Sequence, residues 1–171
     1  MINAKAKTEL PACPVETTLT LIGDKWMLIT AGTAERCNTM TASWGGIGVM
    51  WGKNVAVTVI RPQRYTKEFV ESHDCFTLSF YPEEYKKALS LCGSKSGRDT
   101  DKIREAELTP VFDAQAPYFA ESRLSLVCRK LYYQDMDPSH FLDPTLENNY
   151  KNGDYHRIYV GEIVKVLKNI G

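Results

Sequence analysis

Two arginines and a threonine lie close together in the segment RPQRYTKEFVE, residues 61–71. Arg61 and Arg64 carry planar guanidinium groups whose paired N–H donors match the oxygens of a phosphate. We expect Thr66 to cap a short helix that follows it, and the free amides and dipole at such a helix start also favour an anion. The segment therefore predicts a phosphate site without a glycine loop. The alternative is that both arginines are solvated turn residues.

A second segment, NTMTASW, places hydroxyl groups and small side chains in a row before a tryptophan. Its residues are Asn38, Thr39, Met40, Thr41, Ala42, Ser43 and Trp44. Two interpretations compete. The segment is either an edge strand with a solvated face and a core tryptophan, or a strand whose backbone and hydroxyls hold a ligand.

The two glycine clusters do not match the known nucleotide motifs. Gly46-Ile-Gly48 lacks the GxGxxG spacing that opens a helix, and GSKSG at 93–97 lacks the spacing of a triphosphate loop. A loop that holds Lys95 and Ser96 could still contact one phosphate. No Ser/His/Asp arrangement is recoverable, and the histidines are too far apart in sequence to suggest a metal site, so we expect none. The protein then either only binds, or a cofactor carries its chemistry.

The composition argues for a small target. Lysine plus arginine equals aspartate plus glutamate, at 21 each, so no global field attracts nucleic acid or an anionic membrane. We expect neither as a partner. The N-terminus has no continuous apolar segment, and nothing later approaches the roughly 18 apolar residues of a membrane span. We therefore expect a cytoplasmic protein. The five cysteines are scattered, without a CxxC pair, and are expected to be reduced thiols.

The elements that must position these residues are mostly strands, because the apolar segments are short, β-branched and bounded by turn residues. Strands are expected at 26–32, 39–45, 55–60, 75–81, 123–133 and 155–167. Short helices are expected at 67–72, at 82–91 starting with Pro82, and at 99–108. Residues 135–154 are expected to form an irregular connection.

Helices that do not alternate with strands argue against a doubly wound parallel sheet and for an antiparallel barrel or sandwich. A barrel is favoured because the last strand is long enough to bend and pair with two neighbours. We expect a single domain over residues 1–171, with residues 1–18 as an N-terminal extension.

Four segments in this order resemble the flavin reductase-like family, a branch of the FMN-binding split barrels that includes flavoredoxin-type proteins. They are NTMTASW, VAVTVIRPQRYTKEFVE, CGSKSGRDTDK and GDYHRIYVGEIV, and the resemblance runs from Leu19 to Leu167. It implies a mainly β fold, a six-stranded antiparallel split β-barrel with a few short peripheral helices. It also implies a homodimer that binds one FMN per subunit near the dimer interface.

The resemblance also implies roles for the residues. Small side chains at Thr41, Ala42 and Ser43 would let the strand backbone approach the isoalloxazine edge, with Trp44 packed beside the ring. The resemblance assigns FMN binding to Asn38, Thr39, Met40, Thr41, Ala42, Ser43, Trp44, Arg61, Arg64, Tyr65, Thr66, Lys95, Ser96 and Lys102. The last three would either complete the phosphate cradle or lie on the partner subunit's flavin.

His156 is the candidate catalytic residue. Related reductases place the histidine of a GDH-like motif near the flavin and the nicotinamide pocket. This chain has GDYH, one residue longer, and such an insertion in a strand changes the face to which the side chain points. Tyr155 therefore competes with His156. The GGIGVMWGKN run, where many relatives have a short turn with proline, also departs from the family.

The implied reaction is hydride transfer from NADH or NADPH to flavin N5, followed by electron transfer to a second acceptor. The protein would hold the phosphate, donate hydrogen bonds to the reduced flavin and leave one face open. One alternative is a flavoredoxin-type FMN electron carrier that a protein partner reduces. Another is a split barrel that has lost flavin. The acceptor could be a redox protein or a small molecule.

Overall fold

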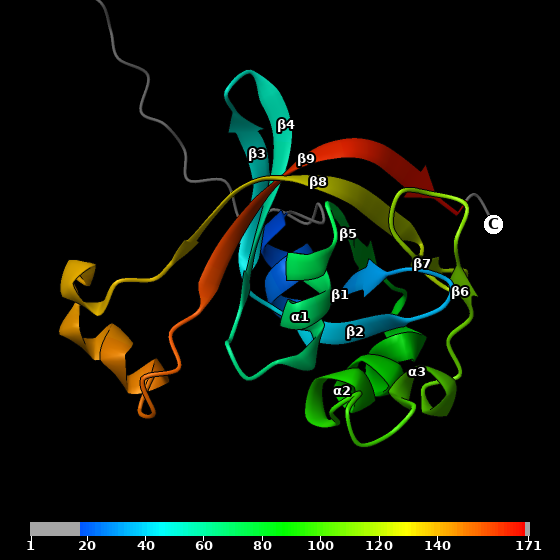
Figure 1. The fold of residues 1–171 in the computed structure, drawn as a ribbon, viewed down its shortest axis with the longest axis horizontal. Helices are drawn as coiled ribbons and strands as arrows, with labels where there is room; N and C mark the ends of the chain where they lie inside the picture. The colour runs from blue at the N-terminus through cyan, green and yellow to red at the C-terminus, as the bar shows by residue number, and fades with distance from the viewer. Residues whose placement is uncertain (1–17, 170–171) are drawn as a thin grey trace, which may run out of the picture.

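The computed structural model describes residues 18–169. Most of the expected N-terminal extension, together with Cys13, lies outside the described residues. The described chain is organised around one curved antiparallel sheet, with helices packed around it (Figure 1). Within residues 18–169 no helix is long and apolar enough to cross a membrane, and no cluster of ligating side chains could hold a metal ion.

Seven strands form the main sheet, in the order β2-β1-β5-β8-β9-β4-β3. Their bounds are β1 Met27–Gly32, β2 Cys37–Ala42, β3 Gly45–Met50, β4 Lys53–Ile60, β5 Cys75–Phe80, β8 Leu124–Asp135 and β9 Arg157–Lys168. A separate pair joins β6 Pro110–Val111 to β7 Tyr118–Phe119. The mainly β, antiparallel prediction is confirmed, and each of the six expected strands is present.

The seventh strand, β3, comes from the glycine-rich run that follows Trp44. It pairs with β4 from Gly45↔Thr58 to Met50↔Lys53, and the two form a hairpin that projects from the top of the molecule (Figure 1). Gly46 and Gly48 have open space where a side chain would stand, so glycine there marks an exposed strand face. The prediction of six strands missed this one because a strand poor in side chains carries little apolar pattern.

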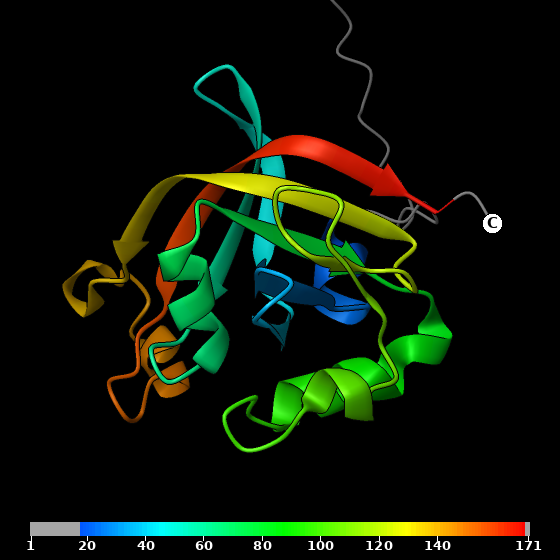
Figure 2. The ribbon, with the colours of Figure 1, turned by 45° about the vertical axis from the view of Figure 1, so that its right-hand side comes forward.

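The two longest strands bend across the sheet and hold it together. β9 pairs with β4 over residues 157–162 and with β8 along its length. This confirms the prediction that the long last strand pairs with two neighbours. The β8–β9 register shifts between Val127 and Cys128, and again between Lys130 and Tyr132. Such irregularities increase local twist, which lets the sheet curl around its interior (Figure 2).

The core lies on both faces of β1, whose six residues are all buried. Ile29 packs inside the curved sheet with Phe76, Phe80 and Tyr159. Leu28, on the other face, packs with residues of the helical layer. Burial on both faces explains why this strand is a continuous apolar run instead of an alternating one.

The helices pack against both faces of β1 and β2. α1 spans Tyr65–Ser72, α2 spans Lys86–Ser94 and α3 spans Lys102–Glu105; α2 and α3 lie below the sheet in Figure 2. α1 adds Phe69 to the cluster inside the curved sheet, and α2 adds Leu89 to the cluster on the other face. Two helix predictions differ in detail. A 3₁₀ turn at Glu83–Tyr85 replaces the expected first turn of the second helix. The third helix is shorter than expected and is capped by Asp101, whose carboxylate accepts the Arg104 amide.

The prediction that Thr66 caps the first helix is wrong. The helix begins at Tyr65, and Arg64 occupies the cap position without a side-chain cap. Thr66 is buried, and its hydroxyl accepts a hydrogen bond from Asn38 Nδ2 at 2.9 Å. The threonine is therefore used to join α1 to β2, a contact between distant residues that a capping pattern does not reveal.

Residues 135–154 form the irregular connection that the sequence predicted. Two 3₁₀ turns, Pro138–His140 and Pro144–Asn149, follow β8 and stand to one side of the sheet (Figure 1). Asp137 and Asp143 accept amide hydrogen bonds at their starts. The connection returns to the sheet through Tyr150 and His156, which are both buried.

Candidate functional site

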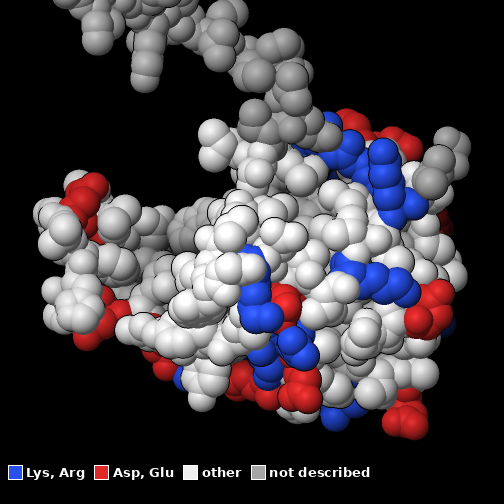
Figure 3. Space-filling model, turned by 90° about the horizontal axis from the view of Figure 1, so that it is seen from above, with Lys and Arg blue, Asp and Glu red and all other residues white. Residues whose placement is uncertain are grey.

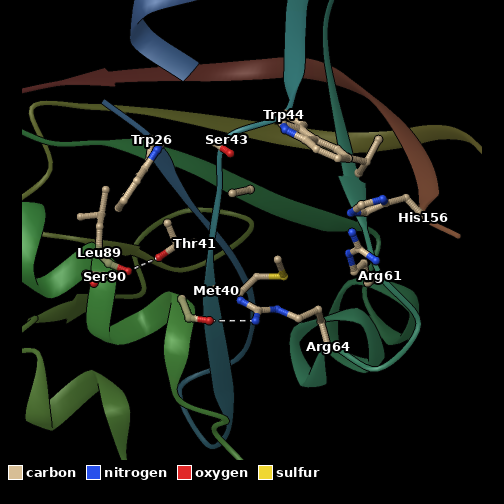
Figure 4. Close-up of a pocket in the computed structure, with 13 residues that line it drawn as sticks. Trp26, Met40, Thr41, Ser43, Trp44, Arg61, Arg64, Leu89, Ser90 and His156 are labelled. Atoms are coloured by element: carbon tan, nitrogen blue, oxygen red, sulfur yellow. Dashed lines mark hydrogen bonds between the residues drawn. The ribbon is translucent and has the colours of Figure 1, made fainter. Parts of the chain in front are cut away.

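A cleft lies where the end of β2, the C-terminal half of α2 and the turn after β4 meet. Its volume is about 430 Å³. Figure 4 shows its lining: Trp26, Met40, Thr41, Ala42, Ser43, Trp44, Val59, Arg61, Arg64, Leu89, Ser90, Gly93 and His156. A mainly apolar wall with a few convergent polar groups is typical of small-molecule sites.

The NTMTASW segment forms one wall of this cleft with five of its seven residues. β2 ends at Ala42, and the chain continues past Ser43 and Trp44 along the cleft before β3 begins. Gly45 makes this turn with φ of 150°, and a Cβ atom there would lie 2.3 Å from the Val57 carbonyl oxygen. The small side chains leave backbone beside the cleft, and the half-exposed Trp44 stands at its rim.

Two threonine hydroxyls of this segment are hydrogen-bonded within the protein. Thr39 is fully buried, and its hydroxyl bonds to that of Thr30 at 2.8 Å. Thr41 donates to the Leu89 carbonyl, which ties β2 to α2. The structure therefore places Asn38 and Thr39 outside the lining of the cleft.

A smaller cavity of about 150 Å³ opens beside the cleft. Its lining is Met40, Gln63, Arg64, Tyr65, Thr66, Ser94, Lys95, Ser96 and Lys102. Met40 and Arg64 line both spaces, so the two are adjacent. Segments that are 30 residues apart in sequence meet here, because the start of α1 faces the end of α2 and the start of α3. The cavity gathers five of the predicted phosphate-binding residues.

Lys102 is a buried cation at this cavity. Its side chain is 3% exposed, and Nζ donates to the Cys92 and Lys95 carbonyl oxygens at 3.0 and 3.1 Å. Burial, reinforced by the Arg64 charge, lowers the pKa of Lys102 to about 8. Of the described acidic residues, none forms an ion pair with it. A buried ammonium without a counter-ion is costly, and an anion in the cavity would offset that cost.

Arg64 is the second cation at this cavity, and it also has no carboxylate partner within residues 18–169. One guanidinium nitrogen donates to the Gly93 carbonyl oxygen at 2.8 Å. Burial, together with the Arg61 charge, lowers the pKa of Arg64. Its remaining donors are available to a ligand in either space that it lines. Arg64 and Lys102 therefore give the small cavity a positive potential.

Arg61 and Arg64 both line the cleft, but they differ in their partners and in whether they reach the small cavity. Arg61 lines the cleft but not the small cavity. It forms an ion pair with Asp154, donates to the Asn149 carbonyl oxygen at 2.9 Å and stacks over the Tyr150 ring. These contacts anchor the 135–154 connection to the end of β4.

Lys95 and Ser96 line the small cavity but have internal partners. The Lys95 ammonium, which is half-exposed, pairs with Glu105. Ser96 Oγ accepts the Arg98 amide at 3.2 Å. The following glycine, Gly97, packs tightly on Asn38, because a Cβ atom there would lie 2.2 Å from Asn38 Oδ1. This close approach holds the loop against β2.

His156 and Tyr155 point to different places. His156 lines the cleft, with its ring centroid 5.1 Å from that of Trp44 (Figure 4). Tyr155 does not line it, and its hydroxyl donates to Glu147 at 2.8 Å. Burial, with a contribution from the Arg61 charge, lowers the pKa of His156 to about 4. The histidine is therefore neutral at physiological pH.

Residues 21–169 match the family model described as the flavin reductase like domain. This match covers most of the chain. The protein belongs to the flavin reductase-like family. None of the curated proteins searched matches it.

Solved structures of the same fold agree with this assignment. A flavoredoxin from Methanosarcina acetivorans is 20% identical with a TM-score of 0.66, over 85% of this chain and 69% of that one. An FMN-binding protein from Thermus thermophilus with bound p-hydroxybenzaldehyde is 19% identical with a TM-score of 0.68, over 96% and 83%. The styrene monooxygenase flavin reductase from Pseudomonas putida S12 is 12% identical with a TM-score of 0.63, over 86% and 80%. At such identities these matches establish the split-barrel fold.

This member of the flavin reductase-like family lines its cleft with several residues that the sequence alone did not single out. They are Trp26, Val59, Leu89, Ser90 and Gly93. Trp26 was assigned to a strand, but it precedes β1 with φ of 68°, and the Lys86 ammonium lies 3.6 Å from its ring centroid. One face of α2, the end of β4 and the residue before β1 meet only in the folded chain, so no local signal could have identified these residues.

Proposed function

We propose that this protein is an FMN-binding oxidoreductase of the NAD(P)H-dependent flavin reductase type. The observation that carries the proposal is the pair of cations without carboxylate partners among the described residues, Arg64 and Lys102, at a small cavity adjacent to a larger, mainly apolar cleft. This arrangement suits a ligand with a phosphate at one end and a planar ring at the other.

The residues at both spaces fit FMN. Arg64 and Lys102 would hold the phosphate, together with the first amides of α1 at Tyr65 and Thr66 and the Ser96 region. The backbone from Thr41 to Ser43 would lie along the ring, and Trp44 would stand beside it. Arg61, which is neutralised by Asp154, would support the wall without contacting the phosphate.

Bound FMN would supply the redox chemistry, accepting a hydride from NADH or NADPH and passing electrons to a second acceptor. The chain's own residues would bind and orient. Backbone amides beside Ala42 and Ser43 would donate hydrogen bonds to ring acceptors, and the neutral His156 would add none of its own positive charge. Nothing in the cleft lining resembles a nucleophile with an activating base, which agrees with a cofactor that carries the chemistry.

We further propose a homodimer, as for the family. Several large apolar side chains of the described residues are exposed on the β3–β4 hairpin and along β8 and β9: Val49, Met50, Trp51, Leu131, Tyr132, Tyr133, Val164 and Val166. Figure 3, which views the molecule from above, shows uncharged areas on this face between clusters of basic and acidic side chains. A second copy of this chain would remove these apolar side chains from water.

An absorbance spectrum tests the function directly. The protein is mixed with FMN, desalted, and then mixed anaerobically with NADH or NADPH. A retained flavin band that bleaches rapidly supports the reductase. A retained band that persists indicates a flavoredoxin-type carrier, reduced by a protein partner. Absence of a retained band contradicts FMN binding and favours a split barrel without flavin.

Replacing Arg64 with alanine is expected to weaken FMN binding by roughly 10- to 100-fold, because a charge-assisted phosphate contact is lost. Replacing Arg61 with alanine is the matched control. It removes an equal charge a short distance away, but from an arginine that is already paired with Asp154. Fluorescence titration with FMN measures both. Equal losses in the two variants would contradict the assignment of Arg64 to the phosphate.

FMN affinity is expected to fall as pH rises from 7 to 9.5. The pKa of Lys102 is lowered to about 8, so its charge is present below that pH and lost above it. The phosphate, with a second pKa of about 6, is mostly the dianion throughout this interval, and it loses its partner as Lys102 deprotonates. Riboflavin, which lacks the phosphate, serves as the control in the same titrations. A constant FMN affinity across this range would contradict a role for the Lys102 ammonium.

A further inference from the structure

Tyr150 contacts the one histidine in the cleft lining and is itself outside that lining. Its hydroxyl oxygen lies 2.9 Å from His156 Nδ1 and 3.3 Å from Met136 Sδ. Both aromatic residues are buried, and their rings meet edge to face with centroids 5.5 Å apart. Tyr150 belongs to the end of the 135–154 connection, so this segment reaches the cleft through the histidine.

The two partners of the hydroxyl differ in strength as acceptors. A thioether sulfur is a weak acceptor, whereas a neutral imidazole nitrogen is a good one. Acceptor strength therefore favours donation of the hydroxyl proton to Nδ1, and such a bond requires Nδ1 to be the unprotonated nitrogen. The other ring nitrogen, Nε2, then carries the proton and has no hydrogen-bond partner among residues 18–169.

We propose that Tyr150 is a positioning residue that holds His156 as the neutral Nε2–H tautomer, so that the imidazole offers one hydrogen-bond donor to an acceptor atom of the ligand in the cleft. The acceptor would be a carbonyl oxygen or ring nitrogen of a planar heterocycle. This inference rests on the proposed function for the identity of that ligand, but the state of the histidine does not depend on it.

The charges around His156 are consistent with a neutral ring. The Arg61 guanidinium packs over the Tyr150 ring, 5.2 Å from its centroid, and disfavours a positive imidazole. Asp154 favours one, but its carboxylate is already bonded to Arg61 and to Gln63 Nε2. Trp44 covers the ring from the rim of the cleft. Together these groups favour an uncharged imidazole that can still donate one hydrogen bond.

Nitrogen-15 NMR of the imidazole groups, recorded on the full chain without added flavin, tests the proposal. We expect His156 to show a protonated Nε2 and an unprotonated Nδ1 at pH 7. Its resonances are assigned with the variant His156→Gln, and the other two histidines, His73 and His140, serve as internal references. A protonated Nδ1 in the unmodified protein would overturn the proposal without any variant.

The variant Tyr150→Phe should mix the two tautomers and raise the pKa of His156 by roughly one pH unit, because the bond that stabilised the neutral form is lost. Tyr155→Phe is the matched control, since it removes a hydroxyl from the same segment that bonds to Glu147 instead. An unchanged tautomer and titration in Tyr150→Phe would overturn the role of Tyr150.

Addition of FMN then tests the donor. We expect the His156 Nε2 resonance to shift while those of His73 and His140 do not. If FMN binds and the resonance does not move, Nε2 does not face the ligand. If FMN does not bind, the proposed function fails, and the tautomer measured without flavin still decides the role of Tyr150.

Discussion

Replacing Lys102 with methionine is expected to lower the affinity for FMN by about 100-fold, because removal of one partner from a buried, hydrogen-bonded charge pair costs a few kcal/mol. Methionine keeps an unbranched chain of similar size, so the wall of the small cavity is preserved. Riboflavin binding should change by less than about threefold, since riboflavin lacks the phosphate that the ammonium would contact. Isothermal titration calorimetry with both ligands measures the difference.

Lys95→Met is the matched control for this variant. Lys95 lines the same cavity, but its ammonium is half-exposed and paired with Glu105, whereas that of Lys102 is buried between two carbonyl groups. We expect a loss of less than about fivefold, because exposed charges contribute little. If Lys102→Met lowers the affinities for FMN and riboflavin equally, Lys102 has a structural role and does not contact the phosphate. If Lys95→Met lowers FMN affinity as much as Lys102→Met does, the effect comes from the general positive potential of the cavity and not from one buried contact.

Replacing Gly161 with valine is expected to have the largest effect on folding. Gly161 lies in β9 between Ala56 and Lys130, and a Cβ atom there would lie 2.8 Å from Cys128 Cβ and 3.0 Å from Phe76 Cζ. Both neighbours are fully buried, so they cannot move without disturbing the core. Overpacking of this kind costs about 3 kcal/mol, which lowers Tm by roughly 6 to 12 °C in a domain of this size.

Gly48→Val is the matched control, because it also replaces a strand glycine with valine and so restricts the backbone in the same way. Gly48 also lies in a strand, but an added Cβ would have no neighbour within 4 Å. Valine suits a strand, so this variant should be neutral or slightly more stable. Urea unfolding followed by circular dichroism compares the two. A Gly161→Val protein as stable as the unmodified chain would mean that β9 does not pack on Phe76 as the structure has it.

The sequence determined the strands and the class of the fold. Each of the six predicted strands is present, because the apolar side chains of a buried strand form a pattern that is visible in its own sequence. β3 was missed for the same reason, since its residues are largely exposed and three of the first four are glycines. The irregular 135–154 connection was also predictable, because its Asp-Pro pairs specify turns locally.

The candidate site could be predicted only as a set of residue types. Sequence identified Arg61 and Arg64 as equivalent forks three residues apart, and Tyr155 and His156 as competitors for one role. The structure separates each pair. Asp154 pairs with Arg61 and leaves Arg64 without a carboxylate partner among the described residues; the start of β9 directs His156 into the cleft and Tyr155 away from it.

Lys102 illustrates why the tertiary structure had to decide. Nothing in its local sequence indicates burial, since it stands in a charged run that reads as a solvated loop. It is buried because α3 packs its first residue against the end of α2, where two carbonyl oxygens accept hydrogen bonds from its ammonium. The residue types that recognise a phosphate are local, and sequence records them. Contacts between distant segments decide which of these side chains are buried, which are paired and where they point. Those contacts exist only in the folded chain.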